Sequence, residues 1–312
     1  MEEAFHGNML FGLQHAMSQR VSDRGHFELM SKYQNMAQVP GSKEQAEKHL
    51  ARLLSIQHPV STGWLHILPT KDSWNIDDAT VKSALRFMLG VSPGPKGQQQ
   101  FSCECRQQGG DSHHAMTCTK MSGLRTWRHN HVQNSVRCGG RTAGLTTTWE
   151  PKERHFNNAQ LGEEGYGKRG DILIGMMDDW LNVDISITHP CKDTTRTKAS
   201  KVAGAAAAQK AREKRSTHET EGTPGYTFVP FIVETYGRLG TDAENLLKEL
   251  ADVAASTGKC DREGYLHWIR KEISLSLIRG NMKMFRQFVG SLTKSMGQNF
   301  MRGDCSAALD CI

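Results

Sequence analysis

The alternation of apolar and polar positions divides the chain into a helical beginning, a mixed middle and a helical end. Near the start it predicts a helix over residues 43–55 and a second helix capped by Asp77 or Asp78. Apolar residues with helical spacing follow that cap: Val81, Leu85, Met88 and Leu89. The proline- and glycine-rich segment 92–97 then breaks the pattern, and we place a domain boundary there.

The middle of the chain predicts a helix, three strands, a helix and a further strand, in that order. The first helix is expected at 122–137, and the three strands follow at 145–149, 171–174 and 181–187. The alanine-rich stretch 195–218 has the composition of one long helix. A last strand at 226–233 contains Pro230, which indicates an edge strand or a bulge. We therefore expect an α/β fold.

From residue 241 onward the pattern is helical again. Two stripes of apolar residues with helical spacing lie there: Leu246, Leu247, Leu250 and Val253, and then Met284, Phe285, Phe288, Val289 and Leu292. Stripes of this kind are usually buried faces of helices. We expect both to pack into a core.

Positive charge gathers in one segment of the chain. The net charge of +6 is a mild basic bias, but eight Lys and Arg lie between residues 192 and 215 against two acids. That local field would attract a phosphate backbone, and Lys198 and Lys201 are our candidates for contacts with DNA. No run reaches the ~20 apolar residues that a membrane span needs, and the N-terminus lacks the order of a signal peptide. We expect an intracellular protein without a membrane partner.

Cysteine and histidine gather between residues 103 and 118. Eight cysteines in an intracellular chain favour metal binding or free thiols over a disulfide framework. Cys103, Cys105 and Cys118 with one histidine make the Cys₃His set of a structural zinc site. His114 is the favoured fourth ligand, and His113 is the alternative. The competing interpretation is a set of buried thiols beside surface histidines.

Two acids lie on the predicted strands of the middle region. Asp171 opens one strand, and Asp184 lies within the next on the face opposite to Val183 and Ile185. An acid inside an apolar strand is unfavourable when it is buried alone, so it needs a partner such as a metal ion. The alternative is a solvated strand face, on which a carboxylate needs no partner.

Several short motifs follow one another along the chain: C-x-C and HHAMTC, then Arg128-His129-Asn130, Glu150-Pro151, Arg169-Gly170-Asp171 and Val183-Asp184-Ile185. Their order and spacing resemble the restriction-like endonuclease, with its zinc knuckle, at the C-terminus of site-specific non-LTR retrotransposon proteins. The likeness covers roughly residues 50–250. It implies a PD-(D/E)xK nuclease fold with the order α-β-β-β-α-β, which agrees with the elements predicted above.

The resemblance implies a metal-dependent endonuclease that cuts target DNA. Asp171, Asp184 and Glu150 would hold one or two Mg²⁺ or Mn²⁺ ions, which activate water and stabilise charge on the phosphate. The two Asp carboxylates should therefore converge at one edge of the sheet. Arg128 and His129 would contact phosphate or a metal ligand.

In this chain, the lysine that the resemblance implies must come from a position other than the usual one. Ser186 stands where simple PD-(D/E)xK enzymes have lysine, two residues after the acid of the strand. In the retrotransposon branch the following helix supplies it, which indicates Lys214, with Lys210 one turn earlier as the second candidate. Gly170 replaces the proline of the motif, and His218 replaces a tyrosine.

Two other functions remain open at this point. One is a catalytically inactive, zinc-containing nucleic-acid-binding module of a decayed or domesticated retroelement, and the other is a zinc-stabilised protein-interaction domain that binds no DNA. We expect no reverse transcriptase domain in this chain, a nuclear location, and element RNA or a separate reverse transcriptase as further partners. The expected organisation is a helical linker at 1–95, the zinc knuckle at 99–120, the endonuclease core at 121–240 and a helical extension at 241–312.

Overall fold

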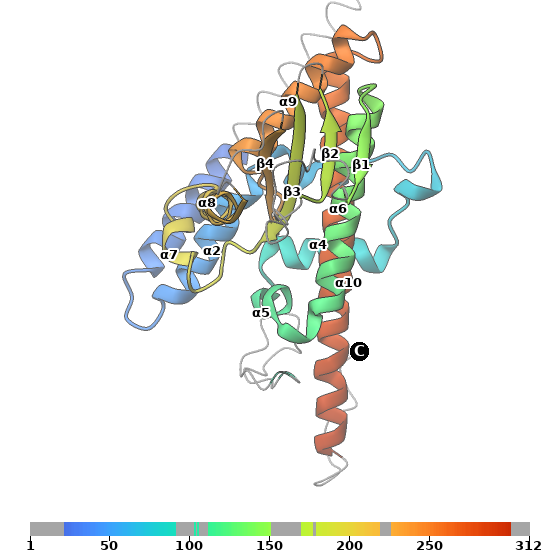
Figure 1. Cartoon of the computed structure of the whole chain (residues 1–312). Coiled ribbons are helices and arrows are strands. Elements are labelled where there is room, and N and C mark those ends of the chain that lie inside the picture. The colour runs from blue at the N-terminus through green and yellow to red at the C-terminus, as the bar shows by residue number, and fades with distance from the viewer. Residues whose placement is uncertain are drawn as a thin grey trace, which may run out of the picture.

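A four-stranded mixed sheet forms the centre of the structure (Figure 1), a computed structural model that describes residues 22–91, 103, 105, 112–150, 170–176, 179–218 and 226–300. Its strands stand in sequence order: β1 (Thr147–Trp149), β2 (Ile172–Gly175), β3 (Trp180–Thr188) and β4 (Tyr226–Glu234). β1, β2 and β3 are antiparallel neighbours, whereas β4 runs parallel to β3. β4 therefore lies at an edge of the sheet, as the proline at position 230 predicts.

Helices pack on both faces of this sheet. One face is covered by α6 (Ser122–Thr142), α9 (Thr241–Ser256) and α10 (Arg262–Phe300), whose apolar side chains join those of the strands in one core. The other face is covered by α8 (Ala205–His218), whose buried alanines pack against Ile232 of β4. The order α6, β1, β2, β3, α8, β4 is the predicted order of a helix, three strands, a helix and a strand.

The predicted apolar stripes of the two C-terminal helices are buried in two different apolar clusters. The stripe of α9 is buried at Leu246, Leu247 and Leu250, and Val253 packs against that core. The stripe of α10 belongs to a second apolar cluster, in which Met284, Phe285 and Phe288 are buried and Val289 packs at the border. Both predicted stripes are therefore confirmed as core, except that the side chain of residue 292 lies outside the described part.

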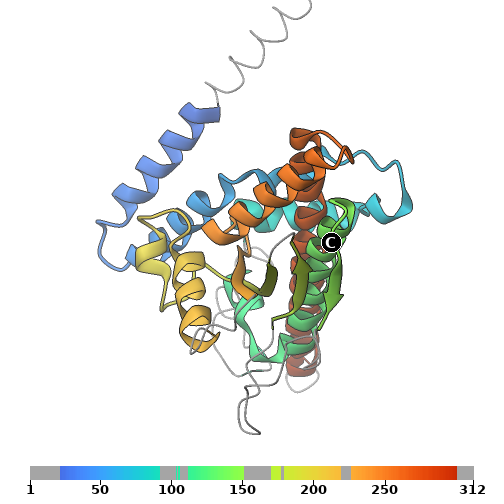
Figure 2. The same cartoon turned by 45° about the horizontal axis from the view of Figure 1, so that its top comes forward.

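The N-terminal part is helical. A helix over residues 22–36 projects from the rest of the molecule (Figure 2), and α2 (Lys43–Ile56), α3 (Pro59–Thr62) and α4 (Asp78–Leu89) follow with short 3-10 turns at Gly63–His66 and Asp72–Trp74. α2 matches the predicted helix at 43–55. No described helix has the length and apolar character that crossing a membrane requires.

α4 starts where the sequence predicts, and it buries Ala84 and Phe87. Asp77 caps it, because its Oδ1 accepts the backbone N–H of the third following residue at 2.8 Å. Ala84 and Phe87 are fully buried, whereas Leu85 and Leu89 are 42% and 66% exposed. The predicted helix is therefore confirmed, and the packing of the Phe87 ring leaves Leu85 and Leu89 on its exposed side.

The predicted long helix at 195–218 is interrupted. α7 (Arg196–Ala199) ends before α8 begins at residue 205, and between them Gly204 has a φ of +76°. A residue with a left-handed backbone cannot lie within a continuous right-handed helix, and glycine adopts this conformation without steric cost. The remaining elements are α5 (Ser112–Thr117) and a 3-10 turn at Thr119–Met121. The predicted boundary at 92–97 lies outside the described residues.

Candidate functional site

Asp184 lies in the middle of β3, on the face that α8 covers. Only 7% of its side chain is exposed, and its Oδ2 lies 2.8 Å from the Nζ of Lys214 in α8. Lys210, the second candidate, instead pairs with Glu213 on its own helix at 3.0 Å. Of the two lysines, Lys214 is the one that reaches Asp184 and offsets its buried charge.

Asp171 immediately precedes β2 and hydrogen-bonds to the two residues that flank Asp184 in β3. Its backbone N–H donates to the carbonyl of Val183 at 2.8 Å, and its Oδ2 accepts the N–H of Ile185 at 2.7 Å. Its other oxygen, Oδ1, lies 3.3 Å from Nε2 of His129 in α6. The two acids therefore lie on neighbouring segments of the sheet, but their partners come from opposite faces. His129 of α6 contacts Asp171 from one face, and Lys214 of α8 pairs with Asp184 on the other.

Glu150 lies beside Asp171 at the end of β1. Its backbone N–H donates to the carbonyl of Asp171 at 3.0 Å, and its φ of +43° is left-handed, which is strained for a residue with a side chain. Its carboxylate is exposed. In the described residues, the groups of three or more potential metal ligands with ligand atoms within 4.8 Å contain only Cys and His. Glu150, Asp171 and Asp184 are not gathered to that spacing.

Gly170, the residue before Asp171, leaves no room for a side chain. A Cβ at this position would lie 2.2 Å from the Oδ1 of Asn182 and 2.7 Å from the carbonyl oxygen of Val183. The N–H of Gly170 also donates to that Oδ1 at 3.0 Å. A proline would both clash and lose the hydrogen bond, which explains why this chain departs from the motif here.

Replacing Gly170 with Ala should therefore lower the free energy of unfolding by ~1–3 kcal/mol, because the crowded atoms include backbone. Denaturant unfolding measures this change. Gly123→Ala in α6 is the matched control, since nothing lies within 4 Å of a Cβ there. That control should leave stability unchanged or slightly higher, because alanine has the better helix propensity. Equal midpoints for Gly170→Ala and the wild type would contradict the close approach.

The predicted zinc ligands Cys103, Cys105, His114 and Cys118, here called the Cys/His cluster, come together with all ligand atoms within 4.8 Å. The sulfurs of Cys103 and Cys118 are 3.6 Å apart, and Cys105 Sγ lies 3.2 Å from His114 Nε2. Two thiolates bound to one tetrahedral zinc at about 2.3 Å are about 3.8 Å apart. The cluster can therefore hold a metal ion such as zinc.

Burial sets the charge of these thiols before a metal binds. It raises the pKa of Cys103 to about 12 and raises the pKa of Cys118 above its usual value. Both thiols are therefore protonated at neutral pH in the metal-free protein. Metal binding must release those protons, so metal affinity should fall as the pH falls.

The two adjacent histidines of α5 serve different groups. Successive residues in a helix point about 100° apart, so His113 and His114 cannot face the same centre. His114 joins the three cysteines, whereas His113 faces His189 and Cys191 in a second buried group. The structure thus selects His114 for the Cys/His cluster. His189 and Cys191 were missed from the sequence, although they directly follow a predicted strand.

Arg128 corrects a prediction. It is only 2% exposed, and its guanidinium donates to the Oδ1 of Asn281 at 2.6 Å and to the sulfur of Met116 at 3.7 Å. Burial, with the neighbouring Arg125, lowers its pKa to about 9. The prediction that it contacts phosphate or a metal ligand is wrong, because Gly280 of α10 leaves the space into which it folds.

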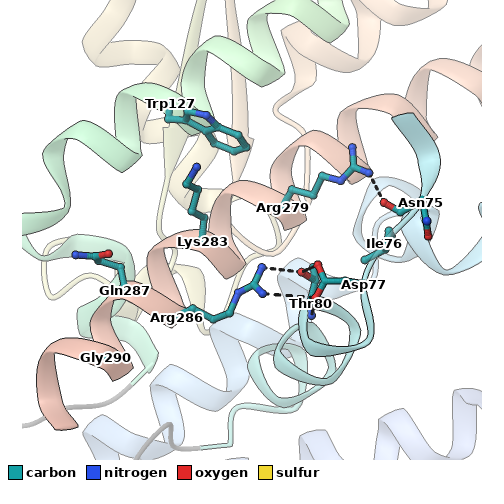
Figure 3. A pocket seen from close by; sticks show the side chains of 10 residues that line it. All are labelled: Asn75, Ile76, Asp77, Thr80, Trp127, Arg279, Lys283, Arg286, Gln287 and Gly290. Carbon is teal, nitrogen blue, oxygen red and sulfur yellow. Dashed lines mark hydrogen bonds and ion pairs between the residues drawn. The ribbon is translucent and has the colours of Figure 1, made fainter. Parts of the chain in front are cut away.

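Trp127, the residue before Arg128, points instead toward a basic pocket of about 610 Å³ (Figure 3). Lys283 of α10 places its Nζ 4.5 Å from the centre of the indole ring. Arg279 and Arg286 line the same pocket, where Arg279 donates to the carbonyl of Asn75 before α4 and Arg286 donates to the hydroxyl of Thr80 in its first turn. Cations beside an aromatic ring are typical of surfaces that bind nucleic acid.

The basic segment predicted for DNA binding lies around α7 and α8. Lys198 and Lys201 are both exposed there. Lys198 lies in α7 and Lys201 directly after it, whereas Lys214, which pairs with Asp184, lies in the separate helix α8. In comparisons with protein-family models and with curated proteins, no family and no relative matches this sequence.

Proposed function

We propose that the chain is a metal-dependent DNA endonuclease with a PD-(D/E)xK-type core, similar to the restriction-like endonucleases of non-LTR retrotransposons. The observation that carries this proposal is the pair of Asp184 and Lys214, a buried acid in an apolar strand held by a lysine of the following helix. Removing such charges from water is unfavourable, and apolar residues would fill the space at least as stably. Because apolar residues would stabilise the fold at least as well, a chemical role explains the presence of this buried ion pair better than a stabilising role does.

Asp171 supports the same proposal. It adds a second carboxylate across the β2–β3 pair, and oxygen ligands of this kind are the ones that Mg²⁺ prefers. When bound, the ion would activate water and offset charge on the attacked phosphate. Lys214 would neutralise part of the negative charge beside it, and His129 would orient Asp171. The order of helices and strands from α6 to β4 is the order expected of such a core.

We further propose that the Cys/His cluster binds zinc. Arg128 supports this, because the partners of its buried guanidinium, Met116 and Asn281, carry no charge. A zinc ion held by three thiolates and one imidazole carries a net charge of −1. Met116 lies between two of the proposed ligands, His114 and Cys118, so a zinc site here would offset the buried positive charge.

A second candidate function is nucleic-acid binding without catalysis. It is favoured by the separate partners of the two acids, because Lys214 already neutralises Asp184 and His129 holds Asp171 from the other face. The basic pocket beside Trp127 would serve such a module equally well. This candidate predicts DNA binding that needs no divalent cation and no acid at position 184.

The binding of Mg²⁺ or Mn²⁺ separates the two candidates. A cation that binds only the folded protein stabilises it, by about 2.7 kcal/mol at 100 times its Kd. The zinc-loaded wild type should gain stability in thermal unfolding when Mn²⁺ is added, and Asp171→Asn should lose most of that gain. Asp252→Asn, which changes an exposed acid of α9, is the control and should keep it. The same gain in all three proteins would contradict a site at Asp171.

DNA binding should depend strongly on salt through α7 and the segment that follows it. Each phosphate contact that is lost lowers the slope of log affinity against log salt by about one unit. Replacing both Lys198 and Lys201 with Ala should therefore reduce this slope by about two units. The control replaces Lys248 and Lys259, two exposed lysines at α9 and its end, and should leave the slope unchanged. Equal slopes for both double variants would place the DNA elsewhere.

A further inference from the structure

We propose a second metal site, distinct from the Cys/His cluster, at which His113, His189 and Cys191 bind one zinc ion. All three residues are buried, and their ligand atoms lie within 4.8 Å of one another. His113 comes from α5, whereas His189 and Cys191 come from the segment directly after β3. The ligands thus converge from parts of the chain more than seventy residues apart.

The spacing of the two imidazoles fits a shared ion. The Nδ1 of His113 lies 3.2 Å from the Nε2 of His189. Two imidazole nitrogens bound to a tetrahedral zinc at about 2.05 Å lie about 3.3 Å apart. Cys191 adds a thiolate, and a mixed set of nitrogen and sulfur ligands is the set that zinc prefers in proteins.

Thr235 fixes the orientation that a zinc-binding His189 needs. Its Oγ1 lies 2.7 Å from the Nδ1 of His189, the ring nitrogen on the far side from His113. Histidines that bind metals usually donate their other N–H to an outer partner of this kind. The carbonyl of Thr235 in turn accepts a hydrogen bond from Asn281 of α10 at 2.6 Å, so the partner is itself held in place.

Tyr236 closes the site on the side of His113. Its hydroxyl lies 3.4 Å from the Nδ1 of His113, and its buried ring stacks on Phe87 with the ring centres 4.7 Å apart. The thiol of Cys191 donates to the carbonyl of Lys48 at 3.3 Å. On metal binding this thiol loses its proton to water and turns to the ion.

The site would fasten the Cys/His cluster to the sheet. β3 and β4 run parallel and end together at Thr188 and Glu234. His189 and Tyr236 follow those two ends, while α5 carries both His113 and the His114 of the Cys/His cluster. A metal ion held by these residues would therefore fix the cluster relative to the ends of the parallel strands. The second metal site does not require nuclease activity.

Zinc analysis of the full chain tests the proposal. The wild type, purified without chelators, should hold about two zinc ions per chain, and Cys191→Ala about one. Cys138→Ser is the matched control, because this partly exposed cysteine lies outside both groups, and it should keep both ions. A single zinc ion in the wild type, or a second ion that persists in Cys191→Ala, would overturn the second site.

X-ray absorption at the zinc edge tests the second site even when Cys191→Ala does not fold, because this measurement uses the wild type. Zinc in the Cys/His cluster alone has about three sulfur ligands, whereas both sites filled give an average of about two. An average near two with two ions per chain supports the second site. An average near three with one ion per chain overturns it, since the histidine pair is then only hydrogen-bonded.

Discussion

Serine in place of Cys105 is expected to release zinc from the Cys/His cluster and to unfold the segment that carries it. Zinc binding contributes roughly 10–16 kcal/mol to the folding of zinc-finger peptides, which is as much as the whole stability of an ordinary domain, about 5–15 kcal/mol. Cys103 and Cys118 also pack in the same apolar cluster as Phe288 of α10. Loss of this metal should therefore loosen α5 first and then the helix packing around it.

Zinc content and amide hydrogen exchange together measure this effect. Cys105→Ser should hold about one zinc ion fewer than the wild type, and amides of residues 112–121 should exchange much faster. Cys138→Ser is again the control and should retain both the zinc and the protection. The zinc assignment fails if the pure wild type contains less than about half an equivalent, or if Cys105→Ser retains the full zinc content.

Asparagine in place of Asp184 is expected to lower the rate of DNA nicking by at least about 10³-fold, because a lost metal ligand removes about 4 kcal/mol or more of transition-state stabilisation. DNA affinity should change little, since the basic residues around α7 remain. The substitution also leaves Lys214 without its charge partner at a position that is 25% exposed. Some loss of stability is therefore expected together with the loss of rate.

A double variant separates the two effects. Replacing Asp184 with Asn and Lys214 with Met removes both charges, so stability should recover toward the wild type while nicking stays absent. Lys210→Ala is the matched lysine control, because Lys210 pairs with Glu213 and not with Asp184, and its rate should stay within a few-fold of the wild type. Recovery of nicking in the double variant would show that Asp184 acts only through stability.

The strands and the zinc ligands could be predicted because their signals are local. Alternating apolar residues placed β2 and β3 to within one residue, and the spacing of the three cysteines indicated the Cys/His cluster. The positions of the helices could also be predicted from local sequence, but the face that a helix buries could not. The stacking of Phe87 on Tyr236 decides which side of α4 is buried, and that contact joins distant parts of the chain.

Long-range packing also explains the remaining errors and omissions. From the sequence, Arg128 was predicted to be a surface cation. It is buried because Gly280 leaves space for its side chain and Asn281, 153 residues later in the chain, accepts its hydrogen bond. The group of His113, His189 and Cys191 was not predicted either, because long-range packing brings it together. Its two histidines are 76 positions apart, and nothing local links them.

Nicking of supercoiled plasmid DNA by the zinc-loaded wild type tests the endonuclease proposal most directly. Nicked circles should form when Mg²⁺ or Mn²⁺ is added, and should not form without an added divalent ion or with Asp184→Asn. Omitting the ion is preferable to adding a chelator, which would also remove zinc. A wild type that binds the plasmid but leaves it supercoiled in both Mg²⁺ and Mn²⁺ would contradict the proposal, as would nicking at the same rate by Asp184→Asn.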